Sequence, residues 1–156
     1  MASTDVSPEP AGRSTDALGV DLALEVVTLP VSDVDRAKRF YQNLGWRLDA
    51  DIERGDDFRV VQFTPPHSPA SIHFGKGLTA AAPGSVDRII LAVKDIEAAR
   101  AELTARGVDV TEVKDTRPAD APGRSYFMYA SFKDPDGNGF LLQEITTRLP
   151  GREWED

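Results

Sequence analysis

The hydrophobic and polar positions of this chain follow two periods, one typical of strands and one typical of helices. Residues 24–31 are apolar and β-branched, which predicts a strand. Residues 34–44 place their apolar side chains on one face of a helix. Half-buried strands are expected at 46–52, 58–63 and 71–74. These elements predict a first module with the order βαβββ.

The same order of elements returns in the second half of the chain. A strand is expected at 88–93, a helix at 96–106, and further strands at 108–113, 126–132 and 140–145. A polar loop separates the second and third of these strands. The second half therefore predicts another βαβββ module.

The two halves also align residue by residue. Residues 26–46 can be laid over residues 88–108 with a constant offset of 62 and no gap. Asp33 then falls on Asp95, where each is expected to cap the N-terminus of a helix, and Gly45 falls on Gly107 after each helix. A unit made twice predicts that the copies stack into one sheet architecture with a shared cleft.

Composition limits the class of protein. The chain has 156 residues, a formal net charge of −8 and no cysteine, so disulfides and thiolate metal sites are excluded. The basic residues are scattered and no apolar run reaches about 20 residues, so neither a nucleic-acid nor a membrane partner is expected. The N-terminus has no basic segment followed by an apolar one, which indicates a cytoplasmic protein.

Local composition predicts the domain limits. The first 20 residues are rich in Ser, Pro, Asp, Ala and Gly, which is typical of a disordered tail. The expected organisation is a disordered tail (1–20), a single domain (22–146) made of two modules (22–75 and 86–146) joined by a linker (76–85), and a loose C-terminal tail (147–156).

Two motifs resemble those of a known superfamily. LPVSDVDRAKRFYQNLGW, residues 29–46, resembles the opening βα unit of the vicinal oxygen chelate superfamily, and FKDPDGNGFLLQE, residues 132–144, resembles its last hairpin. Glyoxalase I, extradiol dioxygenases, and fosfomycin-resistance and bleomycin-binding proteins are members. The resemblance covers residues 22–146. It implies an α+β fold in which tandem βαβββ modules form a cupped mixed β-sheet, with helices outside and the ligand inside, and frequently a homodimer.

The resemblance also implies where a divalent metal would be held. In metal-bearing relatives one ligand lies seven residues before the Asp that begins each helix, and the others lie on the last strand of each module. A hard cation needs His, Asp, Glu or Gln there. Glu25 and Glu144 are next to two of these positions, but neighbours on a strand face opposite ways. The four ligand positions of this chain hold Val26, His73, Arg88 and Leu141.

These residues do not make a metal-binding set. Valine and leucine cannot ligate, and the permanent charge of arginine repels a cation. Because one histidine alone does not hold a metal, we expect no metal or other cofactor. The four residues would instead form an apolar floor with one cation and one imidazole.

Several side chains are candidates for contacting a ligand in the cup. Arg88 would bind an anionic oxygen, and the alternative is an exposed residue at a strand end. His73 would act as acid or base, and the alternative is a structural histidine. Arg59 is a second candidate cation, or forms a salt bridge with Asp56 or Asp57. Gln143 shares a face with Leu141, and the wall candidates, which would equally fill a core, are Trp46, Phe63, Met128 and Tyr126.

Three functions fit this set of residues. The first is a metal-independent binding protein for a small aromatic or anionic molecule. The second is an isomerase, epimerase or lyase acting beside a carbonyl, with His73 moving the proton and Arg88 or Arg59 stabilising the enolate oxygen. The third is a regulatory protein that senses a metabolite. The sequence leaves open whether the modules pair within one chain or across a homodimer.

Overall fold

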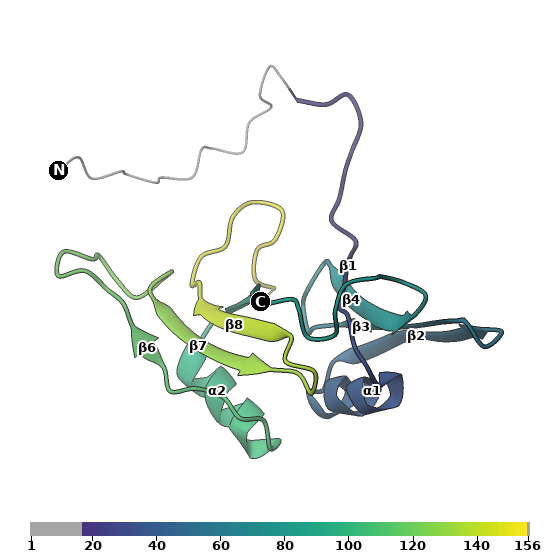
Figure 1. Cartoon of the computed structure of the whole chain (residues 1–156). Coiled ribbons are helices and arrows are strands. Elements are labelled where there is room, and N and C mark those ends of the chain that lie inside the picture. The colour runs from purple at the N-terminus through teal and green to yellow at the C-terminus, as the bar shows by residue number, and fades with distance from the viewer. Residues whose placement is uncertain (1–16, 156) are drawn as a thin grey trace.

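The computed structural model describes residues 17–155 and has an α+β architecture of two four-stranded mixed sheets, each with one helix. The sheets lie side by side and the described N-terminal segment extends away from them (Figure 1). Most of the expected disordered tail, residues 1–16, lies outside the described residues.

The first sheet is formed by residues of the first module in the order β1-β4-β3-β2. Its strands are β1 (Val26–Thr28), β2 (Arg47–Arg54), β3 (Phe58–Thr64) and β4 (Ser71–Lys76). β1 pairs with β4 in parallel, whereas the other neighbours are antiparallel. Helix α1 (Val34–Asn43) packs against β3 and β4.

The second sheet has the equivalent order β5-β8-β7-β6. Its strands are β5 (Ile89–Val93), β6 (Lys114–Asp115), β7 (Met128–Lys133) and β8 (Gly139–Glu144). β5 pairs with β8 in parallel, and helix α2 (Ile96–Ala105) packs against β7 and β8. Both sheets thus place a parallel pair at one edge, which leaves β1 and β5 as edge strands.

The expected helix caps are confirmed in both modules. The carboxylate of Asp33 accepts a hydrogen bond from the backbone N–H of Arg36 at 3.0 Å, and Asp95 accepts one from Ala98 at the same distance. Gly45 and Gly107 follow the helices with φ of 79° and 83°, a conformation that glycine adopts without strain.

One expected strand is wrong. Residues 108–113 do not form a strand, and the sheet gains only the two-residue β6 in the segment expected to be a loop. Val108 and Val110 are buried as a strand pattern requires. However, the side-chain oxygen of Thr111 accepts the hydrogen bond from the N–H of Ser131 at 2.9 Å. A hydroxyl therefore replaces the carbonyl that would have continued the ladder.

The two modules meet at a buried joint made by the Asp-Pro-Asp-Gly-Asn turn. Tyr41 of α1 donates to Asp134 Oδ2 at 2.9 Å, and the Asn138 amide donates to the carbonyl of Pro30 at 2.9 Å. Tyr41 also contacts Phe140 edge to face, with ring centroids 6.1 Å apart. The turn therefore has a structural role, because it fixes one module against the other.

The C-terminal segment folds back onto the domain, which differs from the loose tail that its polar sequence predicts. The indole N–H of Trp154 donates to the carbonyl of Ile145 at 2.9 Å. The guanidinium carbon of Arg148 lies 4.7 Å from the centre of the Trp154 ring. This cation–π contact and the hydrogen bond hold the segment beside the end of β8.

Candidate functional site

Each sheet has one face covered by its helix and one face without such cover. Ile72 and Phe74 are buried under α1, whereas His73 between them is half-buried on the opposite face. In β8, Leu142 is buried toward α2 and Leu141 is half-buried. We call the uncovered sides the open faces of the first and second sheet. Val26, His73, Leu141 and Gln143 all have the strand parity that places them on these faces.

The open face of the first sheet carries His73 within a polar group. Thr28 Oγ1 lies in β1 at 2.7 Å from His73 Nε2 and forms a hydrogen bond with it. Burial lowers the pKa of the His73 imidazole below its usual value. His73 is therefore neutral at pH 7, with one ring nitrogen already bonded to a hydroxyl. The sequence did not single out Thr28, because only the pairing of β1 with β4 places it beside His73.

The open face of the second sheet carries Arg88. This residue immediately precedes β5, is exposed, and lines a cavity of about 390 Å³ together with Leu141, Tyr129 and Lys114. Arg88 forms no ion pair with any described residue. Its guanidinium therefore remains available to an anionic group in this cavity.

Gln143 is on the same face but is already bonded. Its amide donates to the carbonyl of Tyr126 at 3.0 Å and to the hydroxyl of Tyr129 at 3.1 Å. Ile90, Ala92 and the C-terminal Arg148 and Arg152 share a neighbouring cavity of about 290 Å³ with it. Gln143 can still accept a hydrogen bond through its oxygen.

Four of the other predicted contacts lie away from the open faces, whereas Tyr126 is 43% exposed and lines the cavity of Gln143. The Arg59 guanidinium pairs with Asp51 at 3.0 Å and Asp35 at 2.9 Å, so it joins β3 to β2 and α1 instead of pairing with the turn carboxylates. Phe63 and Met128 are buried in the core, on the sides that face the helices. Trp46 is also buried, against Tyr41 and Phe140.

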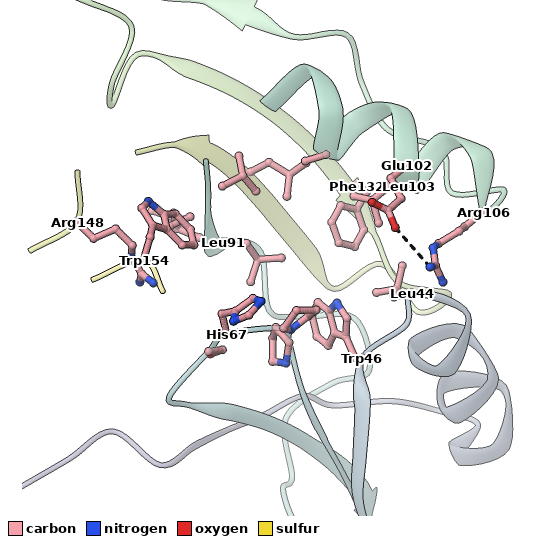
Figure 2. Close-up of a pocket in the computed structure, with 18 residues that line it drawn as sticks. Leu44, Trp46, His67, Leu91, Glu102, Leu103, Arg106, Phe132, Arg148 and Trp154 are labelled. Atoms are coloured by element: carbon pink, nitrogen blue, oxygen red, sulfur yellow. Dashed lines mark hydrogen bonds and ion pairs between the residues drawn. The ribbon is translucent and has the colours of Figure 1, made fainter. Parts of the chain in front are cut away.

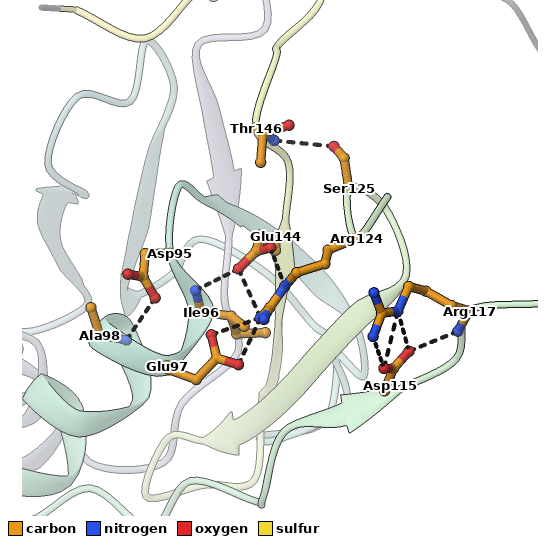
Figure 3. Close-up of polar contacts among 10 residues, drawn as sticks. All are labelled: Asp95, Ile96, Glu97, Ala98, Asp115, Arg117, Arg124, Ser125, Glu144 and Thr146. Carbon is orange, nitrogen blue, oxygen red and sulfur yellow. Dashed lines mark hydrogen bonds and ion pairs between the residues drawn. The ribbon is translucent and has the colours of Figure 1, made fainter. Parts of the chain in front are cut away.

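A register slip that would bring Glu144 to the open face is not seen. Glu144 is buried toward α2, where it accepts the N–H of Ile96 at 3.0 Å (Figure 3). Arg124 donates to Glu144 at 3.0 Å and to Glu97 at 2.6 Å. Asp95, Glu97 and Glu144 form the one carboxylate cluster within residues 17–155 whose oxygens lie close enough to share a metal ion, and Arg124 already pairs with two of the three.

The ligand positions implied by the superfamily motifs do not suit a hard divalent metal. Among Val26, His73, Arg88 and Leu141 only the imidazole is a donor, and Thr28 is hydrogen-bonded to it. A cation such as Mg²⁺, Mn²⁺ or Zn²⁺ requires at least three converging donors.

A groove of about 310 Å³ lies between the two modules, and no motif of the chain indicated it. Figure 2 shows Trp46 and His67 of the first module on one side, and Leu103 and Phe132 of the second on the other. The C-terminal segment closes one end of the groove. Sequence periodicity could not reveal it, because its walls come from segments far apart in the chain.

Comparisons with known proteins agree with this fold. The family model of the Glyoxalase/Bleomycin resistance protein/Dioxygenase superfamily matches residues 23–142. The chain belongs to this superfamily. No curated protein sequence gives a significant match to it.

Solved structures of the superfamily include similar proteins. TnmS3, an antibiotic-binding protein from Streptomyces sp. CB03234, is 32% identical with a TM-score of 0.63, over 83% of this chain and 99% of TnmS3. A glyoxalase/bleomycin resistance protein from the same organism is 33% identical with a TM-score of 0.60, over 78% and 99% of the chains. A superfamily member from Sphaerobacter thermophilus DSM 20745 is 28% identical with a TM-score of 0.63, over 80% and 98%.

The superfamily assignment confirms the fold inferred from the two motifs. It also leaves the chemistry open, because its members include both enzymes and binding proteins. Within the described residues, no helix has the length and apolar character needed to cross a membrane.

Proposed function

We propose that this protein binds a small aromatic or anionic molecule without a metal, and does not transform it. The observation that supports this most is the set of side chains at the four ligand positions. Val26 and Leu141 offer apolar surface, and Arg88 offers a cation without an ion-pair partner among residues 17–155. Similarity to an antibiotic-binding protein over most of both chains favours the same class of function.

We further propose that a second copy of the chain completes the cup. In one chain the open face of each sheet is left partly uncovered, with Ile52 43% and Ile90 50% exposed. Isolated exposed apolar residues are normal, but these two lie on the same sheet faces as the ligand-position residues. Joining the open face of the first sheet to that of the second in another copy would cover both.

The alternative is a metal-independent isomerase, epimerase or lyase with His73 as acid or base. His73 is neutral at pH 7 because burial lowers its pKa, which suits a general base. However, Arg88 lies on the second sheet, so the two side chains would cooperate only across a completed cup. This reaction requires the homodimer, whereas binding to the Arg88 cavity does not.

A thermal-shift screen against antibiotics and aromatic carboxylates would test the proposal. A ligand at 100 times its Kd stabilises the fold by about 2.7 kcal/mol, which is several degrees for a domain of this size. We expect at least one such compound, with the shift reduced in Arg88→Gln. Arg54→Gln is the matched control, because Arg54 is exposed at the β2–β3 hairpin.

Two results would contradict the proposal. Equimolar Zn, Ni, Mn or Fe in protein purified without chelators would show that the protein holds a metal. Chemical conversion of a stabilising compound, detected by mass spectrometry, would favour the enzyme instead.

A further inference from the structure

The groove between the modules has the size and lining of a small-molecule site. Its volume is about 310 Å³, and an engineered apolar cavity of about 150 Å³ is enough for benzene. One long wall is β5, an edge strand whose outer backbone groups have no partner in the sheet. The apolar lining includes Leu44, Trp46, Leu91, Leu103, Phe132 and Trp154.

Arg148 is the one cation of this groove that lacks an acceptor among residues 17–155. Its Nε is buried without a hydrogen-bond partner, and its guanidinium forms no ion pair. Burial, and then the nearby charge of Arg152, lowers its pKa. Arginine nevertheless remains charged, and its buried Nε–H lacks an acceptor that would offset the loss of water.

The other charged groups of the groove are already paired. Arg106 donates to the carbonyl of Asn43 at 3.0 Å and lies 3.5 Å from Glu102. His67 lies 3.4 Å from Glu155 at an exposed position. Arg148 is thus the group through which the groove would select a charged ligand.

We propose that this groove is a second binding site, distinct from the Arg88 cavity, for a flat aromatic molecule that carries a carboxylate. The rings would lie between Trp46, Leu91 and Phe132, and the carboxylate would accept hydrogen bonds from Arg148. Figure 2 shows Arg148 and Trp154 at one end of the groove and the apolar side chains along its length. The volume suits about two fused rings.

The groove adjoins the open face of the second sheet, because Ile90 belongs to both, but it does not include the Arg88 cavity. Arg148 lines both the groove and the neighbouring cavity of Gln143, but Arg88 lines neither of these two. A substitution at Arg148 therefore tests binding in the groove, and a substitution at Arg88 tests binding in the Arg88 cavity.

The test uses 2-naphthoate and its neutral amide, 2-naphthamide, with the full chain. Trp46 and Trp154 are the two tryptophans of the sequence and both line the groove, so their fluorescence reports occupancy. We expect 2-naphthoate to quench this fluorescence saturably, and titration calorimetry to give the same Kd. Arg148→Gln should weaken naphthoate binding about 10- to 100-fold, with a smaller loss in Arg148→Lys.

Two control variants show whether the loss of naphthoate binding is specific to Arg148. Arg152→Gln removes an exposed charge from the same segment, and Arg88→Gln removes the cation of the open face; each should change the naphthoate Kd less than threefold. Naphthamide binding should not depend on Arg148. The proposal is overturned if naphthoate shows no saturable binding at concentrations up to about its solubility limit. It is also overturned if Arg148→Gln binds naphthoate as tightly as the unaltered chain does, or if Arg88→Gln is the variant that loses naphthoate affinity.

Discussion

At the scale of single residues, strand parity determines which of the candidate side chains are on the open faces. The superfamily motifs imply Val26, His73 and Leu141 as ligand positions, and all three have the strand parity of the open faces. Phe63 and Met128 were chosen because of their residue type, and both are buried toward the helices. Phe63 pairs with the buried Ile72, so its parity already excluded it from the face that carries His73.

The ionisation of His73 gives a prediction at this scale. Burial lowers the pKa of its imidazole, and the hydrogen bond to Thr28 involves a neutral hydroxyl. We expect an NMR titration of His73 to have its midpoint below that of the same residue in the urea-unfolded chain. The folded protein should consequently lose stability as pH falls below about 6.5, since the unfolded chain then binds more protons. A midpoint above the unfolded value would mean that a carboxylate approaches His73 in solution.

At the scale of elements, periodicity located both helices, but it could not show how each segment pairs. Residues 108–113 have a strand pattern and a buried valine pair, yet Thr111 uses its side chain where a ladder carbonyl was expected. Similarly, Arg59 was expected to pair with Asp56 or Asp57 nearby in sequence. It pairs with Asp51 and Asp35, which become neighbours only when α1 packs on the sheet.

The attachment of α1 to the first sheet gives a pH-dependent prediction. Hydrogen bonds from Arg59 and Lys38 hold the pKa of Asp51 well below its usual range. The unfolded pKa is near 3.9, so this stabilisation is complete above that pH and is lost as pH falls toward the folded pKa. We expect Asp51→Asn to be less stable than the unaltered chain at pH 6, with the difference shrinking between pH 5 and 2 in urea unfolding.

Asp57→Asn is the matched control for this experiment. Asp57 is exposed in the turn between β2 and β3 and has no ion pair among the described residues. Its substitution should leave the pH dependence of the urea midpoint nearly unchanged. An equal response of both variants would show that the Asp51 network does not hold α1 to the sheet.

At the scale of the whole molecule, the fold depends on the joint between the modules. The resemblance of residues 132–144 to a superfamily hairpin predicted a turn, but not that Tyr41 of the other module would donate to Asp134. Such a contact links residues 93 positions apart, and no local pattern in the sequence encodes it. The arrangement of the two sheets is therefore the part of the fold that required the structure.

The joint can be tested by removing one hydroxyl. Tyr41→Phe leaves the buried carboxylate of Asp134 without one of its donors, which should lower the free energy of unfolding by about 1–3 kcal/mol in urea titrations. Tyr129→Phe removes a hydroxyl that accepts from Gln143 on the half-buried open face, and should cost less than about 0.5 kcal/mol. Equal losses would mean that the joint contributes no more than a surface contact.

The association of two copies is the remaining prediction at this scale. If open faces from two chains form the cup, the mass in solution should be twice the 17.0 kDa of one chain by light scattering. Ile52→Glu places a charge on the open face of the first sheet and should shift the mass toward one chain, because an unpaired buried carboxylate is costly. Ala80→Glu adds the same charge to the exposed linker and should leave the dimer intact. A single-chain mass for the unaltered protein would mean that each open face binds its ligand alone, with Arg88 and His73 in separate sites.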